Sequence, residues 1–326
     1  MAPVSRRNIL PVLLLVTALI AIIAVATVLV LDRRGEMTVA GTPSSAGGTP
    51  SAAAPSQAPL PKKLGPGARH VHMGDSYAAG TGESDLAPDA PVRCQRTSSN
   101  PGIQVAERMK WAVRDVSCTS AKTEHMTQSQ HRGLAPQTEA LDDSIDVVTV
   151  VLGANDEDFF GFLVSRCAGA GAEDPTGSPC RDQYGQELIE KLTSGTGPNL
   201  KAAYAEIAAK APNAEIYAIG YPWLVPASGA CRPELGFADG DIAFARELQA
   251  ELNSRAKSAV ESVGGTFVDM AELSDGHDAC TTEKVRWIEP AFDADGRTMG
   301  IPGNHPNARG QRAMADALEK AIRAGR

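Results

Sequence analysis

The sequence predicts an α/β protein whose central parallel sheet is covered by helices on both faces, and three observations lead to this prediction. Short apolar segments alternate with amphipathic segments from about residue 68 onward. The segment 145–153, IDVVTVVLG, is apolar almost throughout, as expected of a parallel strand buried on both faces. The amphipathic segments carry apolar residues at three- and four-residue spacing, which is typical of helices that cover a sheet.

The expected elements follow one another in the order of βαβ units. Asn100 and Pro101 supply an N-cap and a first helical residue, and Gly264 with Gly265 ends the longest helical pattern. The strands are expected at 70–73, 112–118, 145–153, 214–220 and 265–270, and the helices at 100–109, 199–213, 239–265 and 306–325.

A long apolar segment stands near the N-terminus. Residues Asn8 to Leu31 include no charge, with arginines on both sides. The segment exceeds the roughly 7–15 apolar residues of a signal-peptide core and covers the roughly 20 that cross a bilayer. Residues 1–34 are therefore expected to form a cytoplasmic stub and a transmembrane signal anchor, with a cleaved signal peptide as the alternative.

Residues 35–67 are rich in Gly, Ser, Ala and Pro and show no hydrophobic periodicity. Such a composition buries too little apolar surface to offset the entropy of ordering, which indicates a disordered linker. The remaining residues, 68–326, are expected to form the folded domain.

The cysteines indicate the compartment of the protein, and the net charge limits the classes of partner that it can bind. None of the six cysteines forms a C-x-x-C pair, so a metal cluster is disfavoured and three disulfides in an exported domain are expected. Fifteen pairings remain open at this point. The net charge of −8 excludes a general nucleic-acid binder. The protein is expected to span the cell membrane once, with its folded domain extracellular. The cysteines are Cys94, Cys118, Cys167, Cys180, Cys231 and Cys280.

Ser76 is the first candidate for a catalytic residue, because it directly follows the first expected strand in MGDSYAAG. Substrates of open α/β sheets bind beyond the carboxyl ends of the strands. The surrounding residues do not match G-x-S-x-G, which excludes the nucleophile elbow of the α/β-hydrolases. Gly-Asp-Ser is also an ordinary turn, so the triplet alone does not establish a nucleophile.

Asn155 directly follows the apolar strand 145–153, in VVLGANDEDFF. A side-chain amide at this place can stabilise an oxyanion. The alternative is that Asn155 caps the helix that follows, and capping is also the role expected of Asp156.

His305 lies just before the last helix, in GNHPNARG, and an imidazole is the natural base for a serine hydroxyl. The rival base is His277, which stands in a polar loop. Of the other histidines, those of the first strand are expected to be structural and those of a polar segment to lie at the surface: His70 and His72, and His125 and His131.

These three sites, in this order, resemble the SGNH (GDSL) hydrolase family, whose members carry Ser, Gly, Asn and His in separate sequence blocks. MGDSYAAGTG resembles the first block, LGAND the third and GNHPNARGQRAMADAL the fifth. The resemblance covers about residues 68–326 and is closest to exported bacterial esterases and lipases with three disulfides. It implies a flavodoxin-like three-layer fold, Ser76 as nucleophile and backbone oxyanion donor, Asn155 as side-chain oxyanion donor and His305 as base. It also implies consecutive cysteine pairing, Cys94–Cys118, Cys167–Cys180 and Cys231–Cys280.

Two positions depart from the family pattern. Ser120 stands in CTSAKT where the family has a glycine whose N–H serves as an oxyanion donor, and a serine can keep that role if its φ is not positive. The family acid would fall three residues before His305, at Pro302, which has no carboxylate. The backbone carbonyl of Pro302 is therefore expected to orient His305, with a carboxylate from Asp293 or Asp295 as the alternative.

The resemblance implies hydrolysis of carboxylic esters, from acyl lipids or small acyl esters, through an acyl-enzyme and without metal or organic cofactor. Two alternatives remain open. One is an esterase or acyltransferase acting on O-acyl groups of envelope polysaccharide, and the other is a catalytically silent binding module. The oligomeric state is not predicted.

Overall fold

The computed structural model describes residues 64–325, and their centre is a five-stranded sheet. The strand order is β2-β1-β3-β4-β5, and all neighbouring strands are parallel. This is the flavodoxin-like order, in which β1 and β3 flank the topological switch point. The predicted parallel sheet is confirmed. The strands are β1 (Arg69–Gly74), β2 (Ala112–Asp115), β3 (Val147–Val151), β4 (Glu215–Ile219) and β5 (Thr266–Val268).

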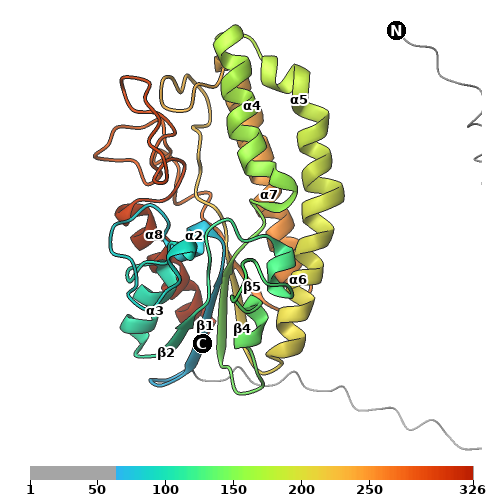
Figure 1. The fold of residues 1–326 in the computed structure, drawn as a ribbon, viewed down its shortest axis with the longest axis vertical. Coiled ribbons are helices and arrows are strands. Elements are labelled where there is room, and N and C mark those ends of the chain that lie inside the picture. The colour runs from blue at the N-terminus through green and yellow to red at the C-terminus, as the bar shows by residue number, and fades with distance from the viewer. Residues whose placement is uncertain (1–63, 326) are drawn as a thin grey trace, which may run out of the picture. The chain divides into compact units, whose positions relative to one another are not determined.

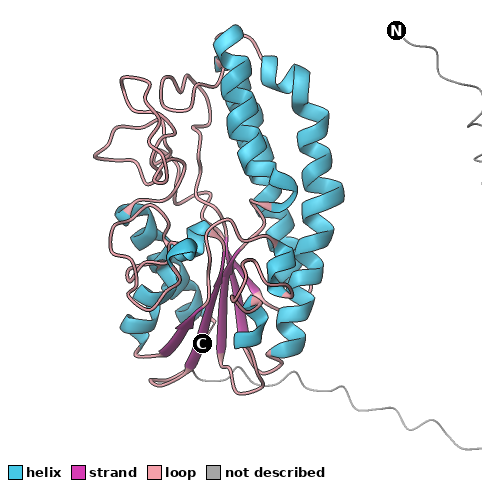
Figure 2. Ribbon diagram, viewed as in Figure 1, coloured by secondary structure: helices cyan, strands magenta, loops and turns pink. Residues whose placement is uncertain are grey.

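Helices cover both faces of the sheet (Figure 1, Figure 2). Helices α3 and α8 pack together on one face, and α6 and α7 pack together on the other. Helices α4 and α5 extend beyond the carboxyl ends of the strands (Figure 1). The helices are α2 (Ser76–Ala79), α3 (Pro101–Met109), α4 (Phe159–Glu173), α5 (Pro179–Glu190), α6 (Gly197–Lys210), α7 (Ile242–Glu261) and α8 (Ala308–Ala324), with a π-helical segment, Lys191–Thr196, between α5 and α6.

Strand β3 shows why the sheet lies at the centre of the fold. All five of its residues are buried. Val147 and Val151 join the apolar cluster on the side of α8, whereas Val148 and Val150 join the cluster on the side of α6. Successive side chains of a strand point to opposite faces, so an uninterrupted apolar run is what this position requires.

The four helices expected from periodicity correspond to α3, α6, α7 and α8. Helices α4 and α5 were not separately predicted. The sequence of α4 is apolar or small on most sides, and that of α5 is mainly polar, so neither shows a clear apolar stripe.

The three disulfides pair as the family resemblance implied: Cys94–Cys118, Cys167–Cys180 and Cys231–Cys280. The bond Cys167–Cys180 joins α4 to α5. The expected anchor and linker, 1–34 and 35–67, lie almost wholly outside the described residues. Within residues 64–325, no helix combines the length and the apolar character that a membrane span needs.

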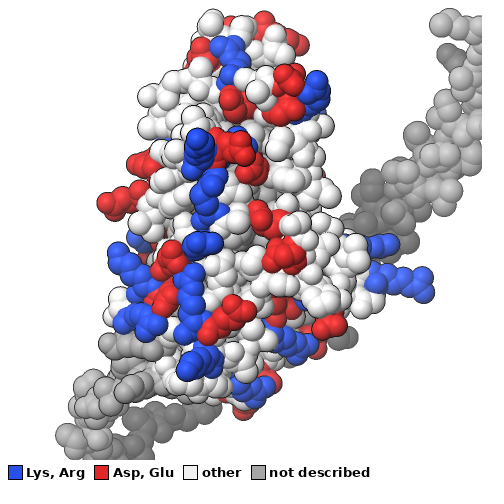
Figure 3. Space-filling view, turned by 90° about the vertical axis from the view of Figure 1, so that its left-hand side faces the viewer, with Lys and Arg blue, Asp and Glu red and all other residues white. Residues whose placement is uncertain are grey.

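Charges of both signs alternate on the face shown in Figure 3. Arg108 on α3, for example, pairs with Asp316 and Glu319 on α8. On this face positive and negative side chains are interspersed, so the charges do not form a continuous basic patch there.

Candidate active site

Ser76 begins the short helix α2, directly beyond the carboxyl end of β1. The side chain of Asp75 caps this turn by accepting a hydrogen bond from the N–H of Tyr77 at 3.0 Å. Ser76 is 7 % exposed, and Asp75 is fully buried. Within residues 64–325 the N–H of Ser76 has no hydrogen-bond acceptor, so it remains available to an oxyanion.

Gly74 allows this turn to approach β3. Its φ is 127°, and a Cβ at this position would lie 2.0 Å from the carbonyl oxygen of Val151. The N–H of Asp75 donates to the same oxygen at 2.9 Å. The side chain of Gln137 binds both the N–H and the carbonyl of Gly74, at 2.7 and 2.9 Å. Any larger residue at 74 would therefore displace the serine from the end of β3.

Tyr221 joins the serine turn to the asparagine segment. It follows β4, and its hydroxyl donates to Asp75 while accepting the N–H of Ala154 at 3.1 Å. Burial raises the pKa of Asp75 to about 7, and the hydrogen bonds from Tyr221 and from the N–H of Tyr77 oppose this rise. The cap of the serine turn is therefore a carboxyl group that titrates near neutral pH.

Asn155 lies at the carboxyl end of β3 and begins a 3₁₀ turn, Asp156–Asp158. Its side chain makes no capping hydrogen bond, so the alternative role as a helix cap is wrong. Instead its amide donates to the carbonyl of Ala121 at 3.1 Å. An amide nitrogen has two donors, and the second is free for a substrate oxygen.

Ser120 is next to this contact and departs from expectation. Its φ is 61°, in the left-handed region, whereas a negative φ was the condition set for keeping the donor. This left-handed conformation is the one that a glycine would adopt, and Ser120 adopts it at a cost of about 1–2 kcal/mol for a residue with a Cβ. The N–H therefore points as it would in a glycine, so the positive φ does not by itself remove the donor. Within residues 64–325 the N–H of Ser120 has no acceptor.

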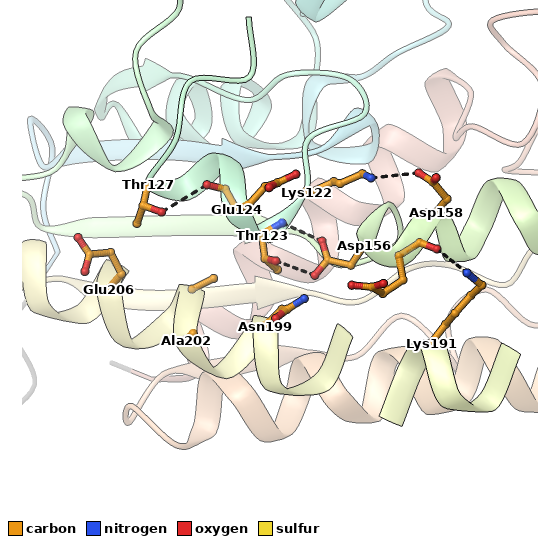
Figure 4. Close-up of a pocket in the computed structure, with 12 residues that line it drawn as sticks. Lys122, Thr123, Glu124, Thr127, Asp156, Asp158, Lys191, Asn199, Ala202 and Glu206 are labelled. Atoms are coloured by element: carbon orange, nitrogen blue, oxygen red, sulfur yellow. Dashed lines mark hydrogen bonds and ion pairs between the residues drawn. The ribbon is translucent and has the colours of Figure 1, made fainter. Parts of the chain in front are cut away.

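Asp156 fixes the Ser120 segment against the Asn155 segment. It is 2 % exposed and accepts hydrogen bonds from the N–H and the hydroxyl of Thr123, at 2.8 and 2.6 Å (Figure 4). It thereby binds the N–H of the first residue of the 3₁₀ turn Thr123–Met126, whose N-cap position is Lys122. Burial raises its pKa, and the bonds from Thr123 oppose this.

A polar cleft of about 790 Å³ opens beside this contact (Figure 4). Its walls come from the turn at 122–127, the segment 156–158 and helix α6, and an ion pair between Lys122 and Asp158 crosses it at 3.1 Å. Ser76, Asn155 and His305 do not line it. The cleft therefore neighbours the site without containing the residues expected to react.

His305 lies in the loop before α8, and backbone contacts hold this loop. Its carbonyl accepts the N–H of Glu289 at 2.9 Å, and the N–H of Asn304 donates to the carbonyl of Glu289 at 2.7 Å. Burial lowers the pKa of His305, while the carbonyls of Ile301 and Gly303 oppose the decrease. The imidazole is therefore neutral at neutral pH, as a general base must be.

The carbonyl that orients His305 belongs to Ile301. It lies 2.8 Å from Nδ1, so the prediction that Pro302 would fill this place is wrong by one residue. The carbonyl of Pro302 instead accepts the backbone N–H of His305 at 3.1 Å. Asp293 and Asp295 both pair with Arg297, and Asp293 also accepts the N–H groups of Asp295 and Arg297. Among residues 64–325 no carboxylate is within 4.0 Å of the imidazole.

Tyr77 brings the histidine loop to the serine turn. Its hydroxyl donates to the carbonyl of Asn304 at 2.7 Å, and its ring lies 5.8 Å from the ring of His305. In the described residues no hydrogen bond joins Ser76 Oγ to His305 Nε2. Catalytic hydrogen bonds are often long without substrate and shorten in the Michaelis complex.

The other histidines have structural contacts. His277 stacks on Trp287 with ring centroids 4.2 Å apart, and its Nδ1 is bonded to the carbonyl of Val285. His70 and His72 are buried and both contact the hydroxyl of Thr149 at 2.7 Å, in agreement with the structural role expected of them.

Sequence reasoning missed the contribution of Asp75, Tyr221 and Thr123 to this site. One signal was present for Tyr221: it follows an expected strand, in AIGYPW, as Ser76 and Asn155 follow theirs. Nothing in the spacing indicated that its hydroxyl would reach Asp75.

The serine follows β1 and the asparagine follows β3 at the carboxyl edge of a parallel sheet, and Tyr77 binds the loop of the histidine to the serine turn. These are the residue types that a serine hydrolase uses, at the edge where ligands of this fold class bind. Residues 72–313 match the GDSL-like lipase/acylhydrolase family, and the chain belongs to that family. It is a serine esterase or lipase.

Relatives agree with this assignment. The chain is 38% identical over 259 residues to Lipase 2 of Streptomyces coelicolor, covering 78% of this chain and 86% of the relative. The structure of an extracellular lipase from Streptomyces rimosus has a TM-score of 0.64 at 21% identity, covering 78% of this chain and 99% of that one. For phospholipase A1 from Streptomyces albidoflavus the TM-score is 0.61 at 22% identity, with coverage of 78% and 99%. At these identities the two structures show the shared fold alone.

Proposed function

We propose that the protein hydrolyses carboxylic esters of acyl chains, with Ser76 as nucleophile and His305 as general base. His305 accepts the proton of the Ser76 hydroxyl while Oγ forms a bond to the ester carbonyl carbon. The resulting oxyanion is stabilised by the N–H groups of Ser76 and Ser120 and by the amide of Asn155. His305 then gives its proton to the departing alcohol, and an acyl-enzyme remains.

Water completes the reaction. His305 accepts a proton from the water as its oxygen attacks the acyl carbon, and the same proton returns to Ser76 Oγ when the acid leaves. The carbonyl of Ile301 keeps Nδ1 protonated, so that Nε2 is the nitrogen that accepts the proton. A carbonyl carries no charge and stabilises the imidazolium less than a carboxylate would.

The observation that carries this proposal is the hydrogen bond from Tyr77 to the carbonyl of Asn304. It joins the residue after the proposed nucleophile to the residue before the proposed base, across 227 positions of sequence. Two segments so far apart in the sequence are brought together at the switch point of the sheet, where ligands of this fold class bind.

The test compares Ser76→Ala with the unchanged full-length protein on p-nitrophenyl acetate and p-nitrophenyl octanoate. We expect kcat to fall by about 10⁴-fold or more, because only the oxyanion donors and substrate binding remain. Ser129→Ala, at an exposed serine, serves as the matched control and should behave as the unchanged protein. Equal activity in Ser76→Ala would exclude Ser76 as the nucleophile.

We further propose that residues 1–34 anchor the protein in the cell membrane, that 35–67 form a linker and that the hydrolase domain, 68–326, is extracellular. Three disulfides support an oxidising location. Protease added to intact cells should digest the domain, and protection of the domain would contradict this orientation.

A further inference from the structure

An apolar groove of about 560 Å³ lies beside the histidine loop. One wall is helix α4, which begins four residues after Asn155. The other wall is the segment 291–304, which ends immediately before His305. Phe160 and Phe292 face the groove from the two walls. Asn304 lines the groove, and its carbonyl accepts the hydroxyl of Tyr77, the residue after Ser76. The groove therefore neighbours the serine turn and the histidine loop.

Two glycines in α4 leave this groove open. A Cβ built at Gly161 or Gly169 would meet no atom within 4 Å. Glycine is less favourable than alanine in a helix, so packing would normally select a larger residue at such positions. Gly171 of the same helix differs, because a Cβ there would lie 2.4 Å from the carbonyl oxygen of Gly236. Neighbouring atoms thus require Gly171, whereas nothing within the described residues requires the other two.

The glycines are spaced along the length of the groove. Gly161 and Gly169 lie on one face of α4, about 12 Å apart along its axis, with Ser165 between them. All three are exposed, whereas Leu163, Cys167 and Ala170 on the opposite side of α4 are buried in the core. Helix α4 thus has one face packed into the core and one exposed face on which these three residues have small side chains or none.

We propose that this groove holds the acyl chain of the ester and that Gly161 and Gly169 set the chain length accepted; this inference rests on the proposed function. The occupant is an alkyl chain because the walls are mainly apolar. The acyl part is favoured over the alcohol because it stays on the enzyme through both steps. Binding energy from the groove can therefore lower both barriers.

The experiment measures kcat/KM of the full-length protein for p-nitrophenyl acetate, butyrate, hexanoate and octanoate. In the unchanged protein kcat/KM should rise by up to about fourfold per buried methylene. In Gly169→Leu and in Gly161→Leu the octanoate-to-acetate ratio should fall at least tenfold, because a leucine side chain would occupy the groove. Arg166→Leu is the matched control. It adds the same side chain to α4 at a residue that lies over Phe162 and does not line the groove, and it should leave the ratio unchanged.

A second series separates the acyl chain from the alcohol. With alkyl acetates of increasing alcohol length, Gly169→Leu should follow the unchanged protein; a response in this series only would overturn the assignment. An unchanged acyl ratio in Gly169→Leu, in a protein that is folded and hydrolyses acetate, would also overturn it. Gly169→Ala should raise Tm by about 2–4 °C, since it removes only the helix penalty. If the leucine variants do not fold, Gly169→Ala provides the test instead. Its octanoate-to-acetate ratio of kcat/KM should decrease, but by less than in the leucine variants. If the unchanged protein hydrolysed none of these esters, that result would instead refute the proposed function.

Discussion

The serine turn and the histidine loop are held in place in different ways. Side chains fix the turn: Asp75 caps it, Tyr221 binds Asp75, and Gln137 binds Gly74. The histidine loop, residues 300–306, is held mainly through its main chain, and the side chain of Ile301 is 58 % exposed. Substitutions around the serine should therefore disturb catalysis strongly. Around the histidine, only a change of the imidazole itself should do so.

Among substitutions in the histidine loop, His305→Ala should lower kcat the most. We expect kcat on p-nitrophenyl acetate to fall by about 10⁴-fold or more, because the variant lacks the proposed base for the Ser76 hydroxyl. His277→Gln, at the histidine stacked on Trp287, is the control and should retain most of the activity of a folded protein. Retention of kcat within tenfold in His305→Ala would show that another base operates.

Asn155→Ala should lower kcat by about 10²–10³-fold with little change in KM, since the amide would act on the oxyanion and not on the ground state. Asn199→Ala, an exposed asparagine on the wall of the polar cleft, provides the comparison. A rise in KM at constant kcat would mean that Asn155 binds substrate without stabilising the transition state.

Tyr221→Phe tests whether side chains position the serine turn. The hydroxyl lowers the pKa of Asp75, which is about 7, so its removal should raise that pKa further. If ionised Asp75 caps the turn, kcat/KM should fall as pH decreases through about 7, and the variant should lose activity from a higher pH. At pH 7 we expect a decrease of about tenfold, the value of one hydrogen bond to a charged group.

The pH profile separates positioning from a simple loss of stability, because a structural defect lowers activity without moving the apparent pKa. Tyr184→Phe, at a half-buried tyrosine of α5, is the control. The same apparent pKa in Tyr221→Phe and in the unchanged protein would contradict the role assigned to Tyr221.

Side-chain changes in the histidine loop should have the smallest effect. Ile301→Ala keeps the carbonyl that binds Nδ1, and Asp293→Asn alters a turn that does not touch the imidazole. Each should change kcat by less than about threefold, as expected of surface substitutions. A decrease of several orders of magnitude in Asp293→Asn would show that a carboxylate orients His305 during catalysis.

Local sequence was sufficient to predict those features that depend on a single strand or helix. The apolar run 145–153 predicted a strand buried on both faces, and β3 is that strand. Ser76 and Asn155 could be placed because each lies within four residues of the end of a strand, and parallel strands end at one edge of the sheet. The histidine acceptor could not be placed in this way. The turn from Gly300 to Gly303 decides whether the carbonyl of Ile301 or of Pro302 faces Nδ1, and spacing does not show that turn.

The sequence by itself determined the parallel α/β architecture and the order of the candidate residues, because hydrophobic periodicity and the strand–loop boundaries are local properties. The resemblance to a family added the disulfide pairing. Only the tertiary structure decided that Tyr221 reaches Asp75, that Asp156 binds Thr123 and that the glycines of α4 face an apolar groove. The first two contacts join residues separated by 146 and 33 positions in the sequence. Residues so far apart come into contact only when the sheet assembles.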